Sequence, residues 1–351
     1  MKEFITGIQQ AGIGVSDADE AKILYRDLFG MNVLVFDDIA SASLMKRYTG
    51  NKEYLRRALL TLNLQGGGGF EIWQFLNRKP VMPLKSGIPE EPGIYALKIK
   101  TTDIQKALRH CRSFAQMQVS EPFLLPDQRS SFWVIDQFQN RFQIIETPGV
   151  YKKTSQVCGG VIGAVITVSE MEKSLRFYQQ LLPAASQVYE NHSVKWNGFQ
   201  QTDDSGPFHQ ILLHKPGGSS GAFSKLLGHT EIELVQSSGI RKNVKGNGRY
   251  WGDCGFIHLC FDVLNMDLLR KELEDAGYFF TVDSKSSFQM SKASGRFCYL
   301  EDPDGTLIEL VETHQVPVWK KIGWNINLFN RSKNKPLPGW MIGLLALNKV
   351  K

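Results

Sequence analysis

The chain has 351 residues, of which 42% are apolar and 22% are charged, and its formal net charge is +6. This length and composition predict a globular protein of two or three ordinary domains and exclude a disordered or fibrous chain. The sequence has no long apolar run and its five cysteines form no CxxC pair, which argues against a membrane-spanning helix and a zinc ribbon and favours a cytoplasmic protein.

The positive charge is confined to the C-terminal segment 315–351, which carries seven lysines and arginines and no acidic residue. The other 314 residues have a formal net charge of −1, so the body of the protein offers no electrostatic attraction for nucleic acid. The tail also contains three tryptophans, a mixture that could contact an anionic membrane surface. We instead expect it to pack over the body and to end in a short helix after Pro336 and Pro338.

Four segments of the sequence share one order of elements, and we expect each to form a module. Each begins with an apolar strand, continues through a short polar turn into an amphipathic helix, and ends in further strands. In the first segment Ala21, Leu24 and Leu28 lie on one helical face, and Gly30 follows as a C-terminal cap. The predicted first strands are 7–15, 93–101, 160–168 and 255–263.

The spacing between first and closing strands alternates between long and short, which favours duplication of a two-module unit. From the first-strand position to the closing-strand position, the gaps in the four segments are 61, 47, 70 and 51 residues in chain order. We therefore divide the chain into module 1 (4–76), module 2 (92–148), module 3 (159–237), module 4 (254–314) and a basic, tryptophan-containing extension (315–351). A run of four glycines at 66–69 lacks the GK[ST] of a phosphate-binding loop, and we expect a flexible loop or hairpin turn there.

The two end modules each place one imidazole or amide and one carboxylate on short strands. Gln10 and Glu71 lie in the first and closing strands of module 1, and His258 and Glu309 lie in those of module 4. Amide, imidazole and carboxylate groups are ligands for divalent metals, and four of them make a complete site.

The stretches IQQAGIGVSDADEAKILYRDLFGM (8–31) and DPDGTLIELVE (302–312) resemble the vicinal oxygen chelate superfamily, which includes glyoxalase I, fosfomycin resistance proteins and extradiol dioxygenases. The resemblance implies an α+β fold in which four βαβββ modules pair into two half-open mixed β-barrels, with the C-terminal extension outside the repeat. It also implies a divalent metal ion held by the first and last strands of paired modules.

The resemblance assigns one ligand position to each first strand, found by counting back from the turn residues Asp17, Asp103, Glu170 and Asn265, and one to each closing strand. The first-strand positions hold Gln10, Ala96, Gly163 and His258, and the closing-strand positions hold Glu71, Gln143, Glu233 and Glu309. Ala96 and Gly163 have no side chain that binds metal, so modules 2 and 3 have lost much of a site.

The pairing of modules decides which ligands meet. If sequence neighbours pair, one barrel offers Glu233, His258 and Glu309. If the outer modules pair with each other, one barrel collects Gln10, Glu71, His258 and Glu309, the set that the resemblance to glyoxalase I implies. We favour outer pairing because random loss would not be expected to spare one complete set, although neighbour pairing is simpler on chain connectivity.

The implied function is that of a glyoxalase-like, metal-dependent lyase or isomerase that acts through an enediolate on a small carbonyl substrate. Glu309 and Glu71 would be ligands and proton carriers, and Gln10 and His258 would be fixed ligands. One divalent ion is expected, and the ligands do not distinguish zinc, nickel, cobalt, manganese and iron. We expect a small-molecule substrate and a monomer or homodimer.

Two alternatives remain. An extradiol-type ring-cleaving dioxygenase needs a second histidine, which belongs at position 163, a glycine; His229 is a substitute outside the motif. A metal-free protein of the same fold could instead bind a small ligand in the same cleft.

Overall fold

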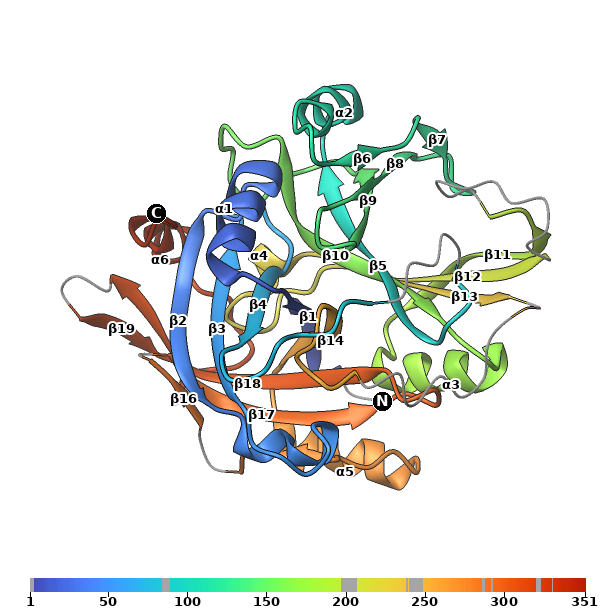
Figure 1. Cartoon of the computed structure of the whole chain (residues 1–351). Helices are drawn as coiled ribbons and strands as arrows, with labels where there is room; N and C mark the ends of the chain where they lie inside the picture. The colour runs from blue at the N-terminus through green and yellow to red at the C-terminus, as the bar shows by residue number, and fades with distance from the viewer. Residues whose placement is uncertain are drawn as a thin grey trace.

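Strand pairing divides the chain into two halves that interleave in sequence. The computed structural model describes residues 3–83, 89–196, 207–237, 239, 249–285, 288–291, 293–319, 323–329 and 331–351. Within these residues, one ten-stranded sheet holds the strands of modules 1 and 4, and one nine-stranded sheet holds those of modules 2 and 3. Figure 1 shows the two groups by colour, with blue strands beside orange ones in one half and cyan and green strands beside yellow ones in the other. We call these halves the outer barrel and the inner barrel.

The outer barrel is a curved mixed sheet whose strand order is β15-β17-β18-β14-β1-β4-β3-β2, with β16 paired to β17 and β19 paired to β18. Its strands are β1 (Ile5–Gly14), β2 (Val33–Ser41), β3 (Leu55–Leu62), β4 (Gly69–Phe75), β14 (Gly255–Val263), β15 (Val282–Asp283), β16 (Phe288–Met290), β17 (Ala293–Glu301), β18 (Leu307–Trp319) and β19 (Trp324–Asn327). Its helices are α1 (Ala18–Phe29), the short 3-10 helix η1 (Ser43–Tyr48) and α5 (Met266–Asp275).

The inner barrel repeats this arrangement with the order β11-β12-β13-β10-β5-β9-β8-β6, and β7 pairs with β8. Its strands are β5 (Gly93–Thr101), β6 (Gln118–Val119), β7 (Phe123–Leu124), β8 (Ser130–Ile135), β9 (Arg141–Glu146), β10 (Cys158–Thr167), β11 (Ser186–Val194), β12 (Phe208–Lys215) and β13 (Thr230–Ser237). Its helices are α2 (Ile104–Arg112), α3 (Met171–Leu181) and α4 (Ser224–Leu227).

The first strands of the end modules pair with each other. β1 runs antiparallel to β14 with Gln10 opposite Cys260, and β5 runs antiparallel to β10 in the same way. The α+β fold with two half-open barrels is therefore confirmed, and outer pairing is correct. Neighbour pairing is wrong, because β1 has no strand of module 2 beside it.

Local sequence explains where the helices begin and end. Asp17 caps α1 by accepting hydrogen bonds from the backbone N–H groups of Asp19 and Glu20, each at 2.9 Å. Gly30 ends the helix in the left-handed region with φ of 70°, as expected from the sequence. The buried face of α1 includes Ala21, Leu24 and Leu28, so the predicted apolar stripe does face the core.

Buried tyrosine–aspartate contacts join module 1 to module 2 and module 3 to module 4, although the strands of these pairs of modules do not pair. The hydroxyl of Tyr25 on α1 donates to Asp136 at 2.6 Å, in the turn before β9 of module 2. The hydroxyl of Tyr178 on α3 donates to Asp302 at 3.0 Å, in the turn before β18 of module 4. Burial raises the pKa of both aspartates to about 6 despite these bonds. Strand pairing and these contacts thus link each module to two others.

The four-glycine run lies in the hairpin connection between β3 and β4, as one of our two expectations had it, but it is a buried junction between the two barrels and not a flexible loop. Gly68 exchanges backbone hydrogen bonds with Val161, at 2.7 and 2.9 Å. A Cβ on Gly67 would lie 2.7 Å from the carbonyl carbon of Gly160. Only glycine allows the two backbones to approach so closely.

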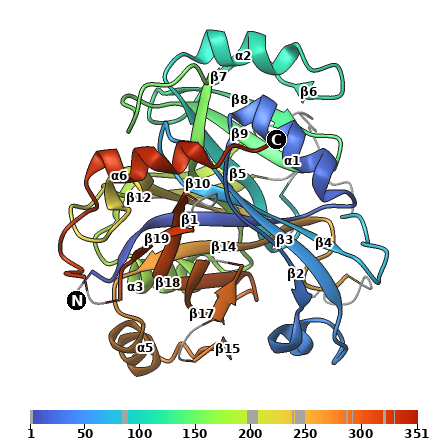
Figure 2. The ribbon, with the colours of Figure 1, turned by 90° about the vertical axis from the view of Figure 1, so that its left-hand side faces the viewer.

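The C-terminal extension packs against the outer barrel and begins within it. β18 runs on through Trp319, past the module boundary that we drew at 314. The chain then returns through β19 to α6 (Gly339–Gly343) and the 3-10 helix η3 (Leu344–Leu347), the short final helix that we predicted; Figure 2 shows α6 in red. Ile342 and Leu345 are buried, and Lys349 forms a β-bridge with Val33. Among the described residues, no helix has the length and apolar character needed to cross a membrane.

We expect Tyr25→Phe to lower the free energy of unfolding by about 1–3 kcal/mol, because it leaves a buried carboxylate oxygen with one partner fewer. Urea unfolding of the variant measures this loss. In a double-mutant cycle with Asp136→Asn, the tyrosine substitution should cost less once the carboxylate is gone. Equal costs in both backgrounds would show that the two side chains are not coupled.

Candidate metal centre

The four side chains assigned to ligand positions in the end modules meet in the outer barrel. His258 Nε2 lies 3.2 Å from Glu71 Oε2 and 3.1 Å from Glu309 Oε2. Gln10 joins them through its amide nitrogen, which donates to Glu309 Oε2 at 3.4 Å. All four side chains are buried, so two carboxylates share a site with little access to water.

Several ligand atoms in this group have no hydrogen-bond partner. They are Gln10 Oε1, Glu71 Oε2 and His258 Nε2. The contacts of His258 Nε2 with the carboxylates are at ion-pair distance but lack hydrogen-bond geometry. Unpaired polar atoms are rare in protein interiors, and those of Glu71 and His258, which lie 3.2 Å apart, indicate a missing partner. Amide oxygen, imidazole nitrogen and carboxylate oxygen are all metal ligands.

Gly12 makes room for the imidazole of His258. It lies opposite His258 across the β1–β14 ladder and opposite Glu71 across the β1–β4 ladder. A Cβ at position 12 would lie 2.4 Å from His258 Cε1 and 2.7 Å from Nε2. Any other residue would therefore push the ring out of its place between the two carboxylates.

Tyr299 orients the imidazole from its other side. The hydroxyl lies 3.2 Å from His258 Nδ1. An imidazole that binds metal through Nε2 carries its proton on Nδ1, and that proton can be donated to the tyrosine oxygen. Burial alone would lower the pKa of His258, but the negative charges of Glu309 and Glu71 outweigh it and raise the pKa to about 9. The site thus favours a positive charge at its centre.

The inner barrel has the same strand register but a different set of side chains. In each module the closing-strand position lies opposite the residue two places after the first-strand position: Gly12 faces Glu71, Cys260 faces Glu309, Lys98 faces Gln143, and Val165 faces Glu233. This agreement supports the assignment of all eight positions from the sequence.

A lysine fills the centre of the inner barrel. Lys98 is fully buried, and its Nζ lies 2.8 Å from Glu233 Oε2 and 3.5 Å from Glu231 Oε2. It lies opposite Gly163, where the outer barrel has Gly12 opposite His258. Because position 163 has no side chain, the lysine can cross the space that an imidazole would occupy. An internal ammonium group compensates the two buried carboxylates.

The alternative ligand set is not assembled. Glu233 belongs to the inner barrel, where it also accepts a hydrogen bond from the Tyr189 hydroxyl at 3.1 Å, whereas His258 and Glu309 lie in the outer barrel. His229, the candidate second histidine of a dioxygenase, lies 3.5 Å from Glu231 in the inner barrel. Glu231 is also bound by Arg129 at 2.6 Å, which leaves this histidine in a structural ion-pair network.

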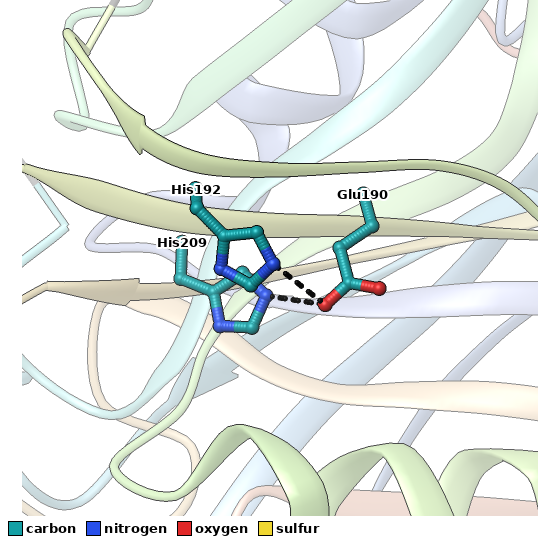
Figure 3. A group of neighbouring side chains, drawn as sticks. All are labelled: Glu190, His192 and His209. Carbon is teal, nitrogen blue, oxygen red and sulfur yellow. Dashed lines mark hydrogen bonds and ion pairs between the residues drawn. The ribbon is translucent and has the colours of Figure 1, made fainter.

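A second group of metal-binding side chains lies on the surface of the inner barrel. Figure 3 shows His192 and His209 stacked beside Glu190, and their Nε2 atoms lie 3.3 and 2.9 Å from the same carboxylate oxygen. They come from β11 and β12 at the edge of the sheet, and His192 is 69% exposed. This group matches none of the repeated ligand positions, and it lies in contact with water.

A cavity opens beside the outer group of ligands. Its volume is about 130 Å³, and its wall includes Gln10, Glu71 and Glu309. Along β18 the residues Glu309, Val311 and Thr313 alternate onto this wall, as the two-residue period of a strand requires. A smaller cavity of about 40 Å³ also reaches Glu309 from the side of Tyr299.

Three residues of these sites escaped the sequence analysis. Lys98 resembles a solvent-facing lysine of an edge strand, although its place two residues after Ala96 could have marked it as inward-facing. Gly12 lies among small residues and gives no signal of its own. Tyr299 reaches His258 only through tertiary packing.

We expect Lys98→Met to destabilise the protein by about 3–5 kcal/mol, because it leaves the buried carboxylate of Glu233 without its cation, although Glu231 keeps Arg129. Thermal and urea unfolding measure the loss. Lys22→Met is the matched control, because Lys22 forms an ion pair with the exposed Asp19. A Lys98→Met variant as stable as the control would show that the inner carboxylates do not need this cation.

The comparisons with known proteins agree with this fold. Residues 161–310 match the model of the Glyoxalase/Bleomycin resistance protein/Dioxygenase superfamily. No curated protein matches the sequence.

Among solved structures, a mutant of glyoxalase I from Zea mays is similar with a TM-score of 0.55 and 15% identity, covering 87% of this chain and 93% of that one. A putative dioxygenase from Bacillus subtilis is similar with a TM-score of 0.57 and 10% identity, covering 89% of this chain and 86% of the other. Identities this low show the fold and not the activity. Residues 161–310 are thus similar to this superfamily, and the chain as a whole has the fold of these solved structures.

Proposed function

We propose that the outer barrel binds one divalent metal ion through Gln10, Glu71, His258 and Glu309, and that the protein is a lyase or isomerase acting on a small carbonyl substrate. The observation that carries this proposal is the buried group of Glu71, His258 and Glu309, whose ligand atoms lie within 4.8 Å of one another. Gln10 is hydrogen-bonded to Glu309, and Gln10, Glu71 and His258 each have one ligand atom without a hydrogen-bond partner. The inner barrel, with Lys98 in place of a cation, would be structural.

The ligand set fits a metal ion by charge as well as by geometry. Two buried carboxylates carry two negative charges, and a divalent cation would balance them without protonating the imidazole. Gln10 would bind through Oε1, the oxygen that has no partner. His258 would bind through Nε2, with its other nitrogen held by Tyr299.

When bound, a divalent ion polarises a substrate carbonyl and so makes the hydrogen on the neighbouring carbon more acidic. The protein's part is to move that proton. Glu309 is the better placed carboxylate, because it borders both cavities, whereas Glu71 borders one. The buried surroundings exclude bulk water, so a proton taken by Glu309 can be returned to the substrate.

The same geometry is less favourable to the alternatives. A ring-cleaving dioxygenase would need two imidazoles and one carboxylate, and the outer barrel offers one imidazole beside two carboxylates. A metal-free binding protein would bury two carboxylates with one histidine as their only partner of opposite charge, which leaves one negative charge without compensation. Metal analysis separates this last possibility from the enzyme.

We expect the metal-free protein to take up one equivalent of divalent metal per chain, measured by titration and elemental analysis against manganese, cobalt, nickel and zinc. Gly12→Ala should lower metal affinity by about 10–100-fold, because its methyl group displaces His258 while every ligand is retained. Gly218→Ala is the matched control, since a Cβ there meets only one atom, at 4.0 Å.

Glu309→Gln supplies a second variant if Gly12→Ala does not fold. It should also reduce metal affinity, because a neutral amide replaces a charged ligand. Full uptake by both variants, or no uptake by the wild-type protein, would contradict the proposed site.

We further expect the metal-loaded protein to exchange the methylene hydrogens of 2-hydroxyacetophenone for deuterium in D2O, followed by NMR. Glu309→Gln should slow this exchange at least about 100-fold, because it removes the group that carries the proton. Glu172→Gln, at an exposed position on α3, should exchange at the wild-type rate. A Glu309→Gln variant that keeps both its metal and its exchange rate would remove Glu309 from the mechanism.

A further inference from the structure

The cavity beside the proposed metal site is polar at one end and apolar elsewhere. Gln10, Glu71 and Glu309 form the polar end. The rest of the wall is mostly aliphatic and aromatic, and it comes from the outer barrel, from α4 of module 3 and from the C-terminal extension. Representative side chains are Leu62 of β3, Phe223 and Leu226 near α4, Phe297 of β17 and Leu345 of η3.

The cavity wall offers no uncommitted positive charge among its described residues. Arg296 is the basic residue there, and all of its guanidinium nitrogens are bound to carboxylates. Its Nε and Nη2 donate to Asp283 at 3.0 and 2.8 Å, and its Nη1 donates to Asp267 at 2.6 Å. An anionic group in this cavity would therefore lie near Glu71 and Glu309 without a counter-charge.

Gln9 and Thr313, two further polar residues of the wall, are also engaged with the protein. The amide nitrogen of Gln9 donates to Thr313 at 2.9 Å and to Asp262 at 3.3 Å. A charged or strongly polar substituent would lose its hydration here and gain little in return, which costs several kcal/mol. A neutral apolar group loses nothing and gains contact with the wall.

The size of the cavity limits the group that fits. A volume of about 130 Å³ is close to the roughly 150 Å³ of an engineered apolar cavity that stays dry and binds benzene. One six-membered ring, or a branched alkyl group of similar volume, would fill it. A larger fused ring system would have to extend beyond the cavity through its open side or displace the wall.

We propose that the substrate carries one uncharged aryl or branched alkyl group, which occupies this cavity while its oxygen atoms face Glu71 and Glu309. This inference rests on the proposed function for the position of the oxygens, but the cavity exists without a metal. The substrate class is thus a small, neutral, aryl- or alkyl-substituted carbonyl compound, and not an anionic thiol adduct.

The test uses full-length, metal-free protein and two fluorinated probes observed by 19F NMR. Fluorobenzene should bind, and 4-fluorobenzoate, which has the same ring and a negative charge, should bind at least about tenfold more weakly. Equal or tighter binding of 4-fluorobenzoate would overturn the proposal, as would the absence of fluorobenzene binding to the folded protein.

Two variants locate the binding. Val311→Phe should weaken fluorobenzene at least about tenfold, because the new ring fills the cavity from the same face of β18 as Glu309. Val188→Phe is the matched control, since Val188 is 45% exposed on β11, and it should bind like the wild type. If Val311→Phe does not fold, Leu62→Ala should enlarge the cavity and admit 1-fluoronaphthalene, which the wild type should bind at least about tenfold more weakly.

The two proposals fail separately in this design. If Val311→Phe leaves the affinity for fluorobenzene unchanged, the probe binds elsewhere and the cavity inference is refuted. The same holds if Leu62→Ala leaves the affinity for 1-fluoronaphthalene unchanged. Metal uptake is measured on its own, so fluorobenzene binding without metal uptake would refute the proposed function and leave the apolar cavity standing.

Discussion

Two buried carboxylates that share one site need a compensating positive charge, and both halves of this protein are organised around that need. In the inner barrel Lys98 supplies the charge from within the chain, at 2.8 Å from Glu233. In the outer barrel His258 lies between Glu71 and Glu309. The unpaired polar atoms of this group would bind the additional cation that we propose. Burying such a group without compensation would cost several kcal/mol, so each site constrains the residues around it.

The two barrels differ in which of two facing strands carries a glycine and which carries the side chain that fills the centre of the site. Gly12 faces His258 in the outer barrel, and Lys98 faces Gly163 at the equivalent place in the inner barrel. A glycine on one strand gives space to the functional side chain of the other. The two sites therefore differ in which strand contributes the side chain, while the strand register stays the same.

Because module 1 pairs with module 4, the outer site is formed by residues from both ends of the chain. β1 and β14 pair although most of the sequence lies between them. The buried glycine junction and the tyrosine–aspartate contacts hold the two barrels together. Metal binding in the outer barrel would therefore stabilise the whole arrangement and not one module alone. The C-terminal extension adds to this half by closing the wall of the cavity at Leu345.

Much of the fold, and the meeting of four side chains in the outer barrel, could be predicted from the sequence because the repeat has regular local spacing. The family resemblance, applied at fixed distances from the turn residues, singled out Gln10, Glu71, His258 and Glu309, and this complete set indicated outer pairing. Lys98 could not be predicted in the same way, since its burial depends on the empty space at Gly163 in another module. The cavity depends on α4 and the extension, whose contacts with the outer barrel have no local sequence pattern. Cytoplasmic location and oligomeric state stay predictions.

The most direct test of the account is anomalous diffraction from crystals of the full-length protein loaded with manganese, cobalt or zinc. We expect one strong anomalous peak in each chain, between His258 Nε2, Gln10 Oε1 and the carboxylates of Glu71 and Glu309, and none beside Lys98. A peak in the inner barrel, a peak only at the surface histidines His192 and His209, or no peak at any of these places would contradict it.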